Sequence, residues 1–204
     1  MEASRTLGKS MEDKKTLRRE MLARRDTMAA QDIRALNGEL WKQLEACPAL
    51  WDGRTIYTYI SYRQEADTLA LIRRLWDMGL PVAAPRVKGR QMEFYQIRSQ
   101  ADIRPGYKGI PEPGEDCVPV KDENGLVVVP GAVFDARGYR IGYGGGFYDR
   151  FLEENPGLAT MGLAYGFQVI DRVPAQPFDR PVSAVLTPSG LVKCRQGMEF
   201  PPRR

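Results

Sequence analysis

Residues 55–85 read TIYTYISYRQEADTLALIRRLWDMGLPVAAP, and this stretch decides the fold class. The β-branched and aromatic residues at 55–60 follow an Asp-Gly turn signal and predict a strand. From Leu69 to Trp76 the apolar residues recur at helical spacing, and Gly79 is suited to end that helix. A second strand is predicted at 81–85. Strand, helix and strand in this order are typical of a parallel sheet covered by helices.

Outward from this unit, the chain continues to alternate predicted strands with helices and loops. Further strands are predicted at 92–97, 126–130, 159–166 and 182–187, and the apolar run at 126–130 is typical of a strand buried on both faces. Residues 10–46 carry an apolar stripe and predict one or two long helices, while 104–124 predicts a surface connection. We therefore expect an α/β fold, a three-layer sandwich whose mostly parallel sheet has helices on both faces and the N-terminal helix packed against it.

The length of 204 residues and the hydrophobic content of 43% are enough for one sizeable core. We expect a single α/β domain at 10–204, preceded by a disordered segment at 1–9. The cysteines form no C-x-x-C pair, so a reducing compartment is the simplest setting. The sequence has no signal-peptide pattern and no apolar run of membrane-spanning length, which favours a cytoplasmic protein.

The chain contains no histidine, and this excludes several kinds of chemistry. A Ser-His-Asp triad and an imidazole-bound metal are both impossible, so any catalysis must use carboxylates, Lys, Arg, Tyr or backbone amides. The net charge of +4 and the pI near 9.0 suit phosphate-rich small ligands and nucleic acid alike.

A glycine-rich loop is the strongest functional signal, because residues 138–151 read GYRIGYGGGFYDRF. The glycines let backbone N–H groups approach an anion without a Cβ atom in the way. A helix predicted at 147–154 would place its positive N-terminal end directly behind the loop. The spacing matches neither a P-loop nor G-x-G-x-x-G. The loop predicts a phosphate-binding cradle, and a turn needed only for packing is the alternative.

The segment from Val129 to Asp135, followed by Gly138 and by residues 140–150, resembles the signature of the 5-formyltetrahydrofolate cyclo-ligase family. Shorter matches at 85–86 and 109–113 extend the resemblance, which covers residues 14–187. It implies an α/β enzyme that uses ATP and Mg²⁺ to convert 5-formyltetrahydrofolate to 5,10-methenyltetrahydrofolate. The formyl oxygen would be phosphorylated, and ADP and phosphate would be released.

The resemblance also implies roles for individual residues. ATP would be bound by cations of the N-terminal helix and by the glycine loop: Lys14, Arg18, Arg140, Gly142, Gly144, Gly145, Gly146 and Tyr148. The folate would be bound by Ile60, Glu65, Tyr143 and Phe147. Arg140 and Tyr143 would take part in catalysis. Asp149 and Asp179 would hold Mg²⁺.

The chemistry of these residues agrees with such roles. Lys14 and Arg18 are four residues apart, so on a helix both could reach one triphosphate, although a solvated helix face is the alternative. Glu65 follows the strand at 55–60, at the sheet edge where ligand sites lie, and a carboxylate can accept from two N–H groups of a pterin. Mg²⁺ takes one or two carboxylates besides phosphates, whereas Asp179 could equally be a turn residue.

Two other interpretations stay open. Phe147 stands where the family often has tyrosine and Tyr143 where some members have arginine, so the chain could bind ATP but act on another substrate or be inactive. The second alternative is a basic nucleic-acid-binding module, although no RNA or DNA motif is present.

For the main interpretation, we expect ATP and a reduced folate as ligands and Mg²⁺ as cofactor. We expect neither nucleic acid nor a membrane as partner, and we expect a monomer.

Overall fold

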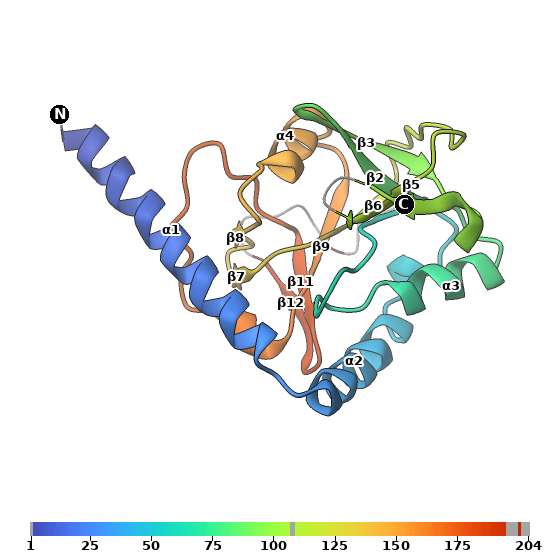
Figure 1. Ribbon diagram of the computed structural model, residues 1–204, viewed down its shortest axis with the longest axis horizontal. Coiled ribbons are helices and arrows are strands. Elements are labelled where there is room, and N and C mark those ends of the chain that lie inside the picture. The colour runs from blue at the N-terminus through green and yellow to red at the C-terminus, as the bar shows by residue number, and fades with distance from the viewer. Residues whose placement is uncertain (1, 107–108, 195–199, 201–204) are drawn as a thin grey trace.

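The computed structural model describes residues 2–106, 109–194 and 200 of the chain. Its centre is a seven-stranded sheet in the order β12-β11-β9-β6-β1-β2-β3 (Figure 1). The strands are β1 (Ile56–Thr58), β2 (Val82–Lys88), β3 (Gln91–Gln96), β6 (Leu126–Val129), β9 (Ala159–Leu163), β11 (Ala184–Thr187) and β12 (Gly190–Lys193). The five strands from β11 to β2 are parallel, and β12 and β3 are antiparallel edges. The prediction of an α/β fold with a mostly parallel sheet is confirmed.

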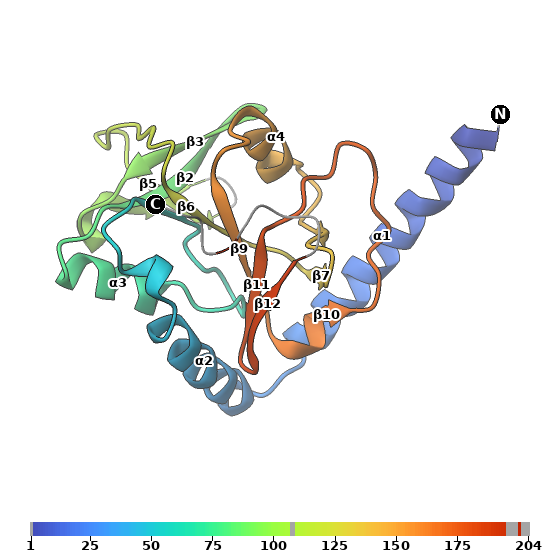
Figure 2. The ribbon, with the colours of Figure 1, turned by 180° about the vertical axis from the view of Figure 1, so that it is seen from behind.

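Helices cover both faces of this sheet, because its central strands are apolar on both sides. Ile56 and Val128 pack in one core with α2 (Ala30–Glu45) and α3 (Leu69–Asp77). Tyr57 and Val127, one residue earlier or later, pack in a second core with α4 (Phe147–Glu154). This alternation is what a strand buried on both faces requires. Figure 2 shows α2 and α3 together, away from α4.

The N-terminal helix packs elsewhere than expected. Helix α1 (Glu2–Asp26) covers a separate three-stranded sheet in the order β10-β7-β8, made by β7 (Val133–Asp135), β8 (Arg140–Ile141) and β10 (Val169–Ile170). Its apolar residues Leu17, Met21 and Leu22 join this small sheet in one cluster. The N-terminal helix was expected to pack against the main sheet, but it is α2 that contacts the main sheet, whereas α1 contacts the small one.

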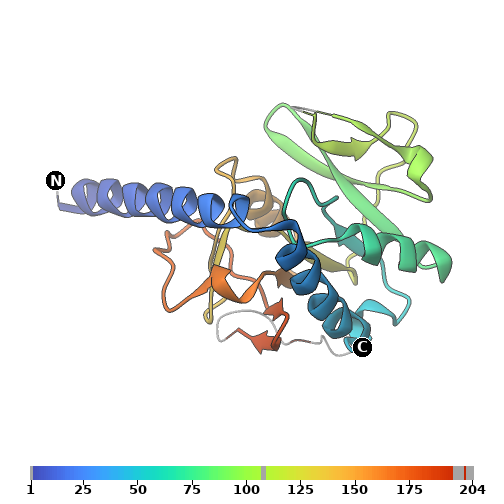
Figure 3. The same cartoon turned by 60° about the horizontal axis from the view of Figure 1, so that its bottom comes forward.

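Helix α1 also begins earlier than predicted. It starts at Glu2, ahead of the expected start near residue 10, so residues 2–9, expected to be disordered, are helical. This stretch has no proline and contains Glu, Ala, Arg, Leu and Lys, all of which favour helix. Figure 3 shows this first part of α1 extending past the rest of the molecule. Residue 1 lies outside the described residues.

Short elements complete the fold. The predicted surface connection at 104–124 contains β5 (Pro111–Pro113), which pairs with β4 (Ile103–Pro105) in a two-stranded antiparallel sheet. Single 3₁₀ turns lie at η1 (Pro48–Leu50), η2 (Gln100–Asp102) and η4 (Gly166–Gln168). No helix within the described part of the chain is long and apolar enough to cross a membrane.

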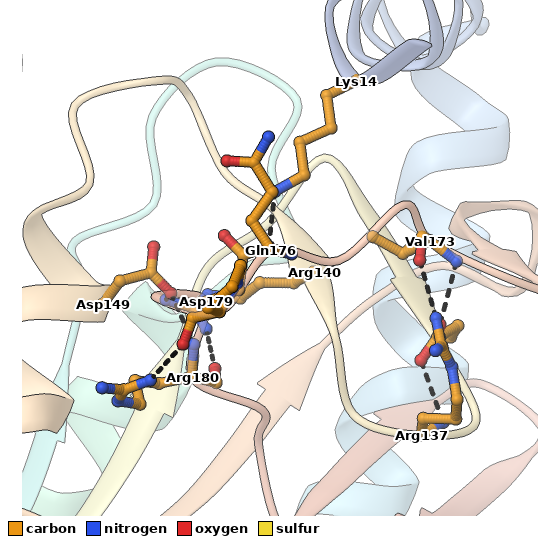
Figure 4. Close-up of polar contacts among 10 residues, drawn as sticks. Lys14, Arg137, Arg140, Asp149, Val173, Gln176, Asp179 and Arg180 are labelled. Atoms are coloured by element: carbon orange, nitrogen blue, oxygen red, sulfur yellow. Dashed lines mark hydrogen bonds and ion pairs between the residues drawn. The ribbon is translucent and has the colours of Figure 1, made fainter. Parts of the chain in front are cut away.

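A buried carboxylate ties the small sheet to the segment that follows β10. Asp135 is fully buried and accepts hydrogen bonds from the guanidinium and N–H of Arg137, and from the N–H groups of Tyr139 and Val173. Arg137 also donates to the Val173 carbonyl, as the right side of Figure 4 shows. The network therefore holds the start of the segment that leads to Asp179.

Replacing Asp135 with asparagine is expected to destabilise the protein by about 2 kcal/mol, because an amide NH₂ would face buried donors. Urea unfolding measures this loss directly. The matched control is Asp116→Asn, since Asp116 is exposed. Equal unfolding midpoints for the two variants would mean that the Asp135 network does not stabilise the fold.

Candidate active site

The glycine loop connects β8 to α4, and its backbone needs glycine. Gly144 and Gly146 have φ angles of +99° and +63°, in the region that other residues rarely adopt. Gly146 is the N-cap of α4, so the positive end of the helix faces the loop. A Cβ atom on Gly144 would lie 3.0 Å from Nη1 of Arg18. Arg18 of α1 therefore reaches the loop, and its role in binding ATP stays a prediction.

A pocket of about 320 Å³ opens on this loop. Its wall combines the predicted cradle with three charged side chains and an exposed aromatic ring: Gly144, Gly145, Gly146, Asp149, Arg150, Glu153 and Phe178. The volume is at the lower end of the usual range for small-molecule sites, about 300–1,000 Å³. The loop therefore faces a space that a ligand could enter.

A buried arginine connects β8 to α4 at the pocket. The side chain of Arg140 is 3% exposed and donates to Asp149 Oδ1 at 3.1 Å and to the Arg180 carbonyl at 2.6 Å. The N–H of Arg180 donates to the same Asp149 oxygen at 3.1 Å. Among the described residues Asp149 Oδ2 has no hydrogen-bond partner, and Figure 4 shows this oxygen pointing away from the network. Asp149 is thus held by one oxygen and has the other available.

Lys14 and Asp179, predicted to bind different ligands, form an ion pair with each other. Lys14 Nζ lies 2.5 Å from Asp179 Oδ2, and that oxygen also accepts from the Gln176 N–H at 2.7 Å. Figure 4 shows Lys14 reaching down from α1 to this pair. The ammonium group also lies 5.9 Å from the ring centroid of Phe178, which lines the pocket. Lys14 is therefore adjacent to the pocket.

Asp149 and Asp179 could supply a few of the ligands of a divalent cation, but they do not form a site made entirely of protein ligands. Within the described residues no group of three or more His, Cys, Asp or Glu could hold a metal ion. Mg²⁺ commonly takes one or two carboxylates and completes its shell with phosphates and water. Asp149, with a free oxygen on the pocket wall, fits that requirement. Asp179 fits less well, because one of its oxygens is occupied by Lys14 and Gln176.

A second polar cluster contains Arg25, Glu65, Tyr148 and Tyr143, the residue directly before Gly144. Arg25 donates from Nη1 to the Tyr143 hydroxyl at 3.0 Å. Tyr143 as a whole is 47% exposed, but desolvation of its hydroxyl end and the nearby Glu65 carboxylate raise the pKa of Tyr143 well above its usual value, while Arg25 opposes them. Burial and Glu65 likewise raise the pKa of Tyr148, whose hydroxyl has no hydrogen-bond partner among the described residues. Both phenols therefore stay protonated near neutral pH and can act as donors.

Glu65 is positioned by its own loop beyond β1. Its Oε2 accepts from the Tyr62 N–H at 2.9 Å, and its carbonyl accepts from the Tyr165 hydroxyl at 3.1 Å. Because that hydroxyl also donates to Asn37 on α2, Glu65 is fixed against two other elements. Glu65 therefore lies near Tyr143 and Tyr148, since its carboxylate raises the pKa of both hydroxyls.

Two residues predicted to contact the folate, Ile60 and Phe147, have no contact with the Glu65–Tyr143 cluster that the described hydrogen bonds or ring contacts show. Ile60 is buried in the core beneath α2 and α3. Phe147 packs against its own loop, since a Cβ atom on Gly145 would lie 2.5 Å from the Phe147 ring. The Arg150 guanidinium covers that ring at 5.1 Å. The roles of Ile60 and Phe147 stay predictions.

Sequence reasoning missed Arg25, Gln176 and Phe178. Arg25 is one of many basic residues on α1, and only its spacing of seven from Arg18 indicates that both lie on one helix face. Gln176 and Phe178 follow β10 in a loop without a recognisable motif, yet Gln176 contacts Asp179 and Phe178 lines the pocket.

A glycine cradle, a buried arginine–carboxylate pair and cations from a neighbouring helix are the parts of an α/β enzyme that handles phosphate groups. The model of the 5-formyltetrahydrofolate cyclo-ligase family matches residues 10–188. The 5-formyltetrahydrofolate cyclo-ligase of Escherichia coli (strain K12) is 30% identical over 174 residues, which are 81% of this chain and 95% of that protein. The cyclo-ligase of Mus musculus is 26% identical over 187 residues, 85% of this chain and 92% of that protein.

Solved structures agree with this comparison. The NMR structure of Aquifex aeolicus 5,10-methenyltetrahydrofolate synthetase has a TM-score of 0.79 and 28% identity, covering 94% of this chain and 97% of that chain. The synthetase from Mycoplasma pneumoniae shares the fold, with a TM-score of 0.67 at 21% identity over 86% of this chain and 99% of that chain. The chain belongs to the 5-formyltetrahydrofolate cyclo-ligase family. The predictions of this family and of a cyclo-ligase enzyme are confirmed.

Proposed function

We propose that this chain cyclises 5-formyltetrahydrofolate to 5,10-methenyltetrahydrofolate by phosphorylating the formyl oxygen with ATP. The observation that supports the proposal most strongly is that Gly144, which lines the pocket on the glycine loop, directly follows Tyr143, whose hydroxyl is near the Glu65 carboxylate. A nucleotide phosphate on the loop and a folate beside Glu65 would then meet at adjacent residues. Such positioning is the main contribution that a protein makes to phosphoryl transfer.

The proposed chemistry has two steps. The formyl oxygen attacks the γ-phosphorus of ATP, an O–P bond forms, and the bond to the β–γ bridging oxygen breaks to release ADP. N10 then attacks the activated formyl carbon and loses its proton, and the C–O bond breaks to release phosphate. The first step converts an amide-like oxygen, which leaves poorly, into a phosphate, which leaves readily.

The charge that moves to the phosphates in the first step needs fixed donors. We assign this role to Lys14, Arg18, Arg140 and the amides of Gly142, Gly144, Gly145 and Gly146. Preorganised donors of this kind stabilise a transition state because they need no reorganisation during the reaction. The buried hydroxyl of Tyr148 has no partner among the described residues, so it could donate to the nucleotide.

On the folate side, the Glu65 carboxylate would accept from N–H groups of the pterin ring. Ile60 and Phe147 are assigned apolar contacts to the same ring. Tyr143 has a raised pKa, so at neutral pH it is a proton donor rather than a base. We assign it a catalytic hydrogen bond to the oxygen that becomes phosphorylated, together with Arg140.

Mg²⁺ would be held by the free oxygen of Asp149 and by Asp179, whose Oδ2 is paired with Lys14. When bound, the ion neutralises phosphate charge.

We also propose that the protein is cytoplasmic and that it is a monomer. An Arabidopsis thaliana relative, 30% identical over 125 residues, is described as mitochondrial.

Omitting one component at a time tests the proposed function. The purified chain is incubated with 5-formyltetrahydrofolate, ATP and Mg²⁺, and methenyltetrahydrofolate is followed by its absorbance. Product is expected only when all three are present. Thermal shifts with each ligand separately distinguish a related protein of different specificity, because a protein that binds only ATP would respond to one ligand and form no product.

A further inference from the structure

Arg25 is a buried cation with too few partners. It lies near the C-terminal end of α1, is 4% exposed, and its side chain makes one hydrogen bond to the part of the chain that the structure describes, from Nη1 to Tyr143. Its Nε is buried and has no hydrogen-bond partner among the described residues. A guanidinium carries five N–H donors, and burying a charged group with donors unmet is unfavourable. An acceptor from a ligand would complete this environment.

The neighbours of Arg25 are those of the proposed folate site. The Tyr143 hydroxyl accepts from Arg25 Nη1 at 3.0 Å, and the Glu65 carboxylate is close enough to raise the pKa of the same hydroxyl. Glu65 also raises the pKa of Arg25 itself, against the effect of burial. Arg25 and Glu65 therefore lie near the same tyrosine hydroxyl, which is hydrogen-bonded to Arg25.

The hydrogen-bonding edge of a pterin matches this pair of charges. The edge presents two donors, the 2-amino group and N3–H, next to one acceptor, the oxygen on C4. A carboxylate satisfies the two donors but leaves the oxygen without a partner. A buried acceptor without a partner costs about 1–3 kcal/mol, so a site for the whole edge needs a donor beside the carboxylate.

We propose that Arg25 binds the C4 oxygen of the pterin while Glu65 binds the 2-amino group and N3–H, so that the two residues together recognise the whole edge. The inference rests on the proposed function, because it assumes that a reduced folate occupies the Glu65 cluster. Tyr143 then has a second role, since its hydroxyl holds the Arg25 guanidinium in place. Arg25 becomes a residue that determines specificity for 4-oxo pterins.

An analogue of the substrate can distinguish recognition of the C4 oxygen by Arg25 from a general effect of its positive charge. In the 4-amino-4-deoxy analogue of 5-formyltetrahydrofolate, an NH₂ donor replaces the C4 oxygen and would face the guanidinium donors. The analogue also lacks N3–H, so Glu65 contributes part of the discrimination. Only the part due to Arg25 should disappear when Arg25 is changed.

The experiment compares Arg25→Met with Arg19→Met, an exposed arginine on the same helix, in the full chain. Dissociation constants for both folates and for ATP are measured by titration calorimetry. Arg25→Met is expected to bind 5-formyltetrahydrofolate about 30-fold more weakly, the middle of the range for a hydrogen bond to a charged group. Its affinity for the 4-amino analogue and for ATP should change by less than about threefold, a value near the error of such comparisons. Arg19→Met should match the wild type.

Equal weakening of both folates by Arg25→Met would overturn the inference, because Arg25 would then act only through packing. An unchanged affinity for 5-formyltetrahydrofolate would overturn it as well. If Arg25→Met does not fold, Arg25→Lys is used, which keeps the charge but has no Nε donor; an unchanged ratio of the two folate constants is then the contrary result. A wild-type chain that binds no 5-formyltetrahydrofolate contradicts the proposed function instead.

Discussion

Lys14→Met is expected to lower kcat/KM for ATP by about 100-fold or more, the usual cost of removing one donor to a transition-state charge. The lysine side chain is mostly buried between α1 and the loop that contains Asp179, and methionine preserves its length without the charge. Steady-state kinetics with ATP as the varied substrate measures the effect. The control is Lys15→Met, because the Lys15 side chain is 61% exposed and its nearest carboxylate is 3.6 Å away.

The ion pair with Asp179 offers a competing explanation, in which Lys14 matters only for holding the loop. A double-mutant cycle distinguishes the two. If Lys14 acts only through the pair, Lys14→Met should cost no further activity in an Asp179→Asn background. We expect most of the loss to persist there, because the phosphate contact does not depend on Asp179.

The position of α1 explains why three of its cations matter. Lys14 pairs with Asp179, Arg18 lies against Gly144, and Arg25 donates to Tyr143. These contacts follow the helix over 11 residues, about 16 Å at the rise of an α-helix. One helix face thus runs from the proposed nucleotide pocket to the proposed folate site, which gives a physical reason for its packing against the small sheet instead of the main one.

The main sheet could be predicted from the sequence because its strands carry strong local patterns. The LVVV run of β6 and the strand, helix, strand order at 55–85 each contain enough residues to show a period. The small sheet could not be predicted in the same way. Its strands β7, β8 and β10 have only two or three residues each, which is too few to show an alternating pattern.

The residues of the candidate site also differ in whether the local sequence could predict them. Gly144 and Gly146 could be predicted as special because glycine alone accommodates such backbone angles. The partners of charged side chains could not, since Lys14 and Asp179 are 165 residues apart and Arg25 and Tyr143 are 118 apart. Such pairs depend on how α1 packs, and that packing follows from a tertiary fit rather than from any local pattern.

Asp149→Asn is expected to lower kcat by about 1,000-fold, because several kcal/mol of charge stabilisation would be lost with the metal ligand. An amide can still accept from the Arg180 N–H, so the loop should keep its structure while the negative charge disappears. Glu154→Gln on the exposed side of α4 is the matched control. Urea unfolding of both variants measures whether the loss of the Arg140 pair weakens the fold.

Activity alone cannot separate a lost metal ligand from a disturbed Arg140, so the decisive measurement is Mg²⁺-dependent ATP binding. In the wild type, adding Mg²⁺ should raise the affinity for ATP and the thermal stability of the complex. In Asp149→Asn both responses to Mg²⁺ should fall, while ATP binding without Mg²⁺ should improve, because a negative charge next to the phosphates is removed. An unchanged response to Mg²⁺ would show that Asp149 serves only to orient Arg140, and the metal would then have to be held elsewhere.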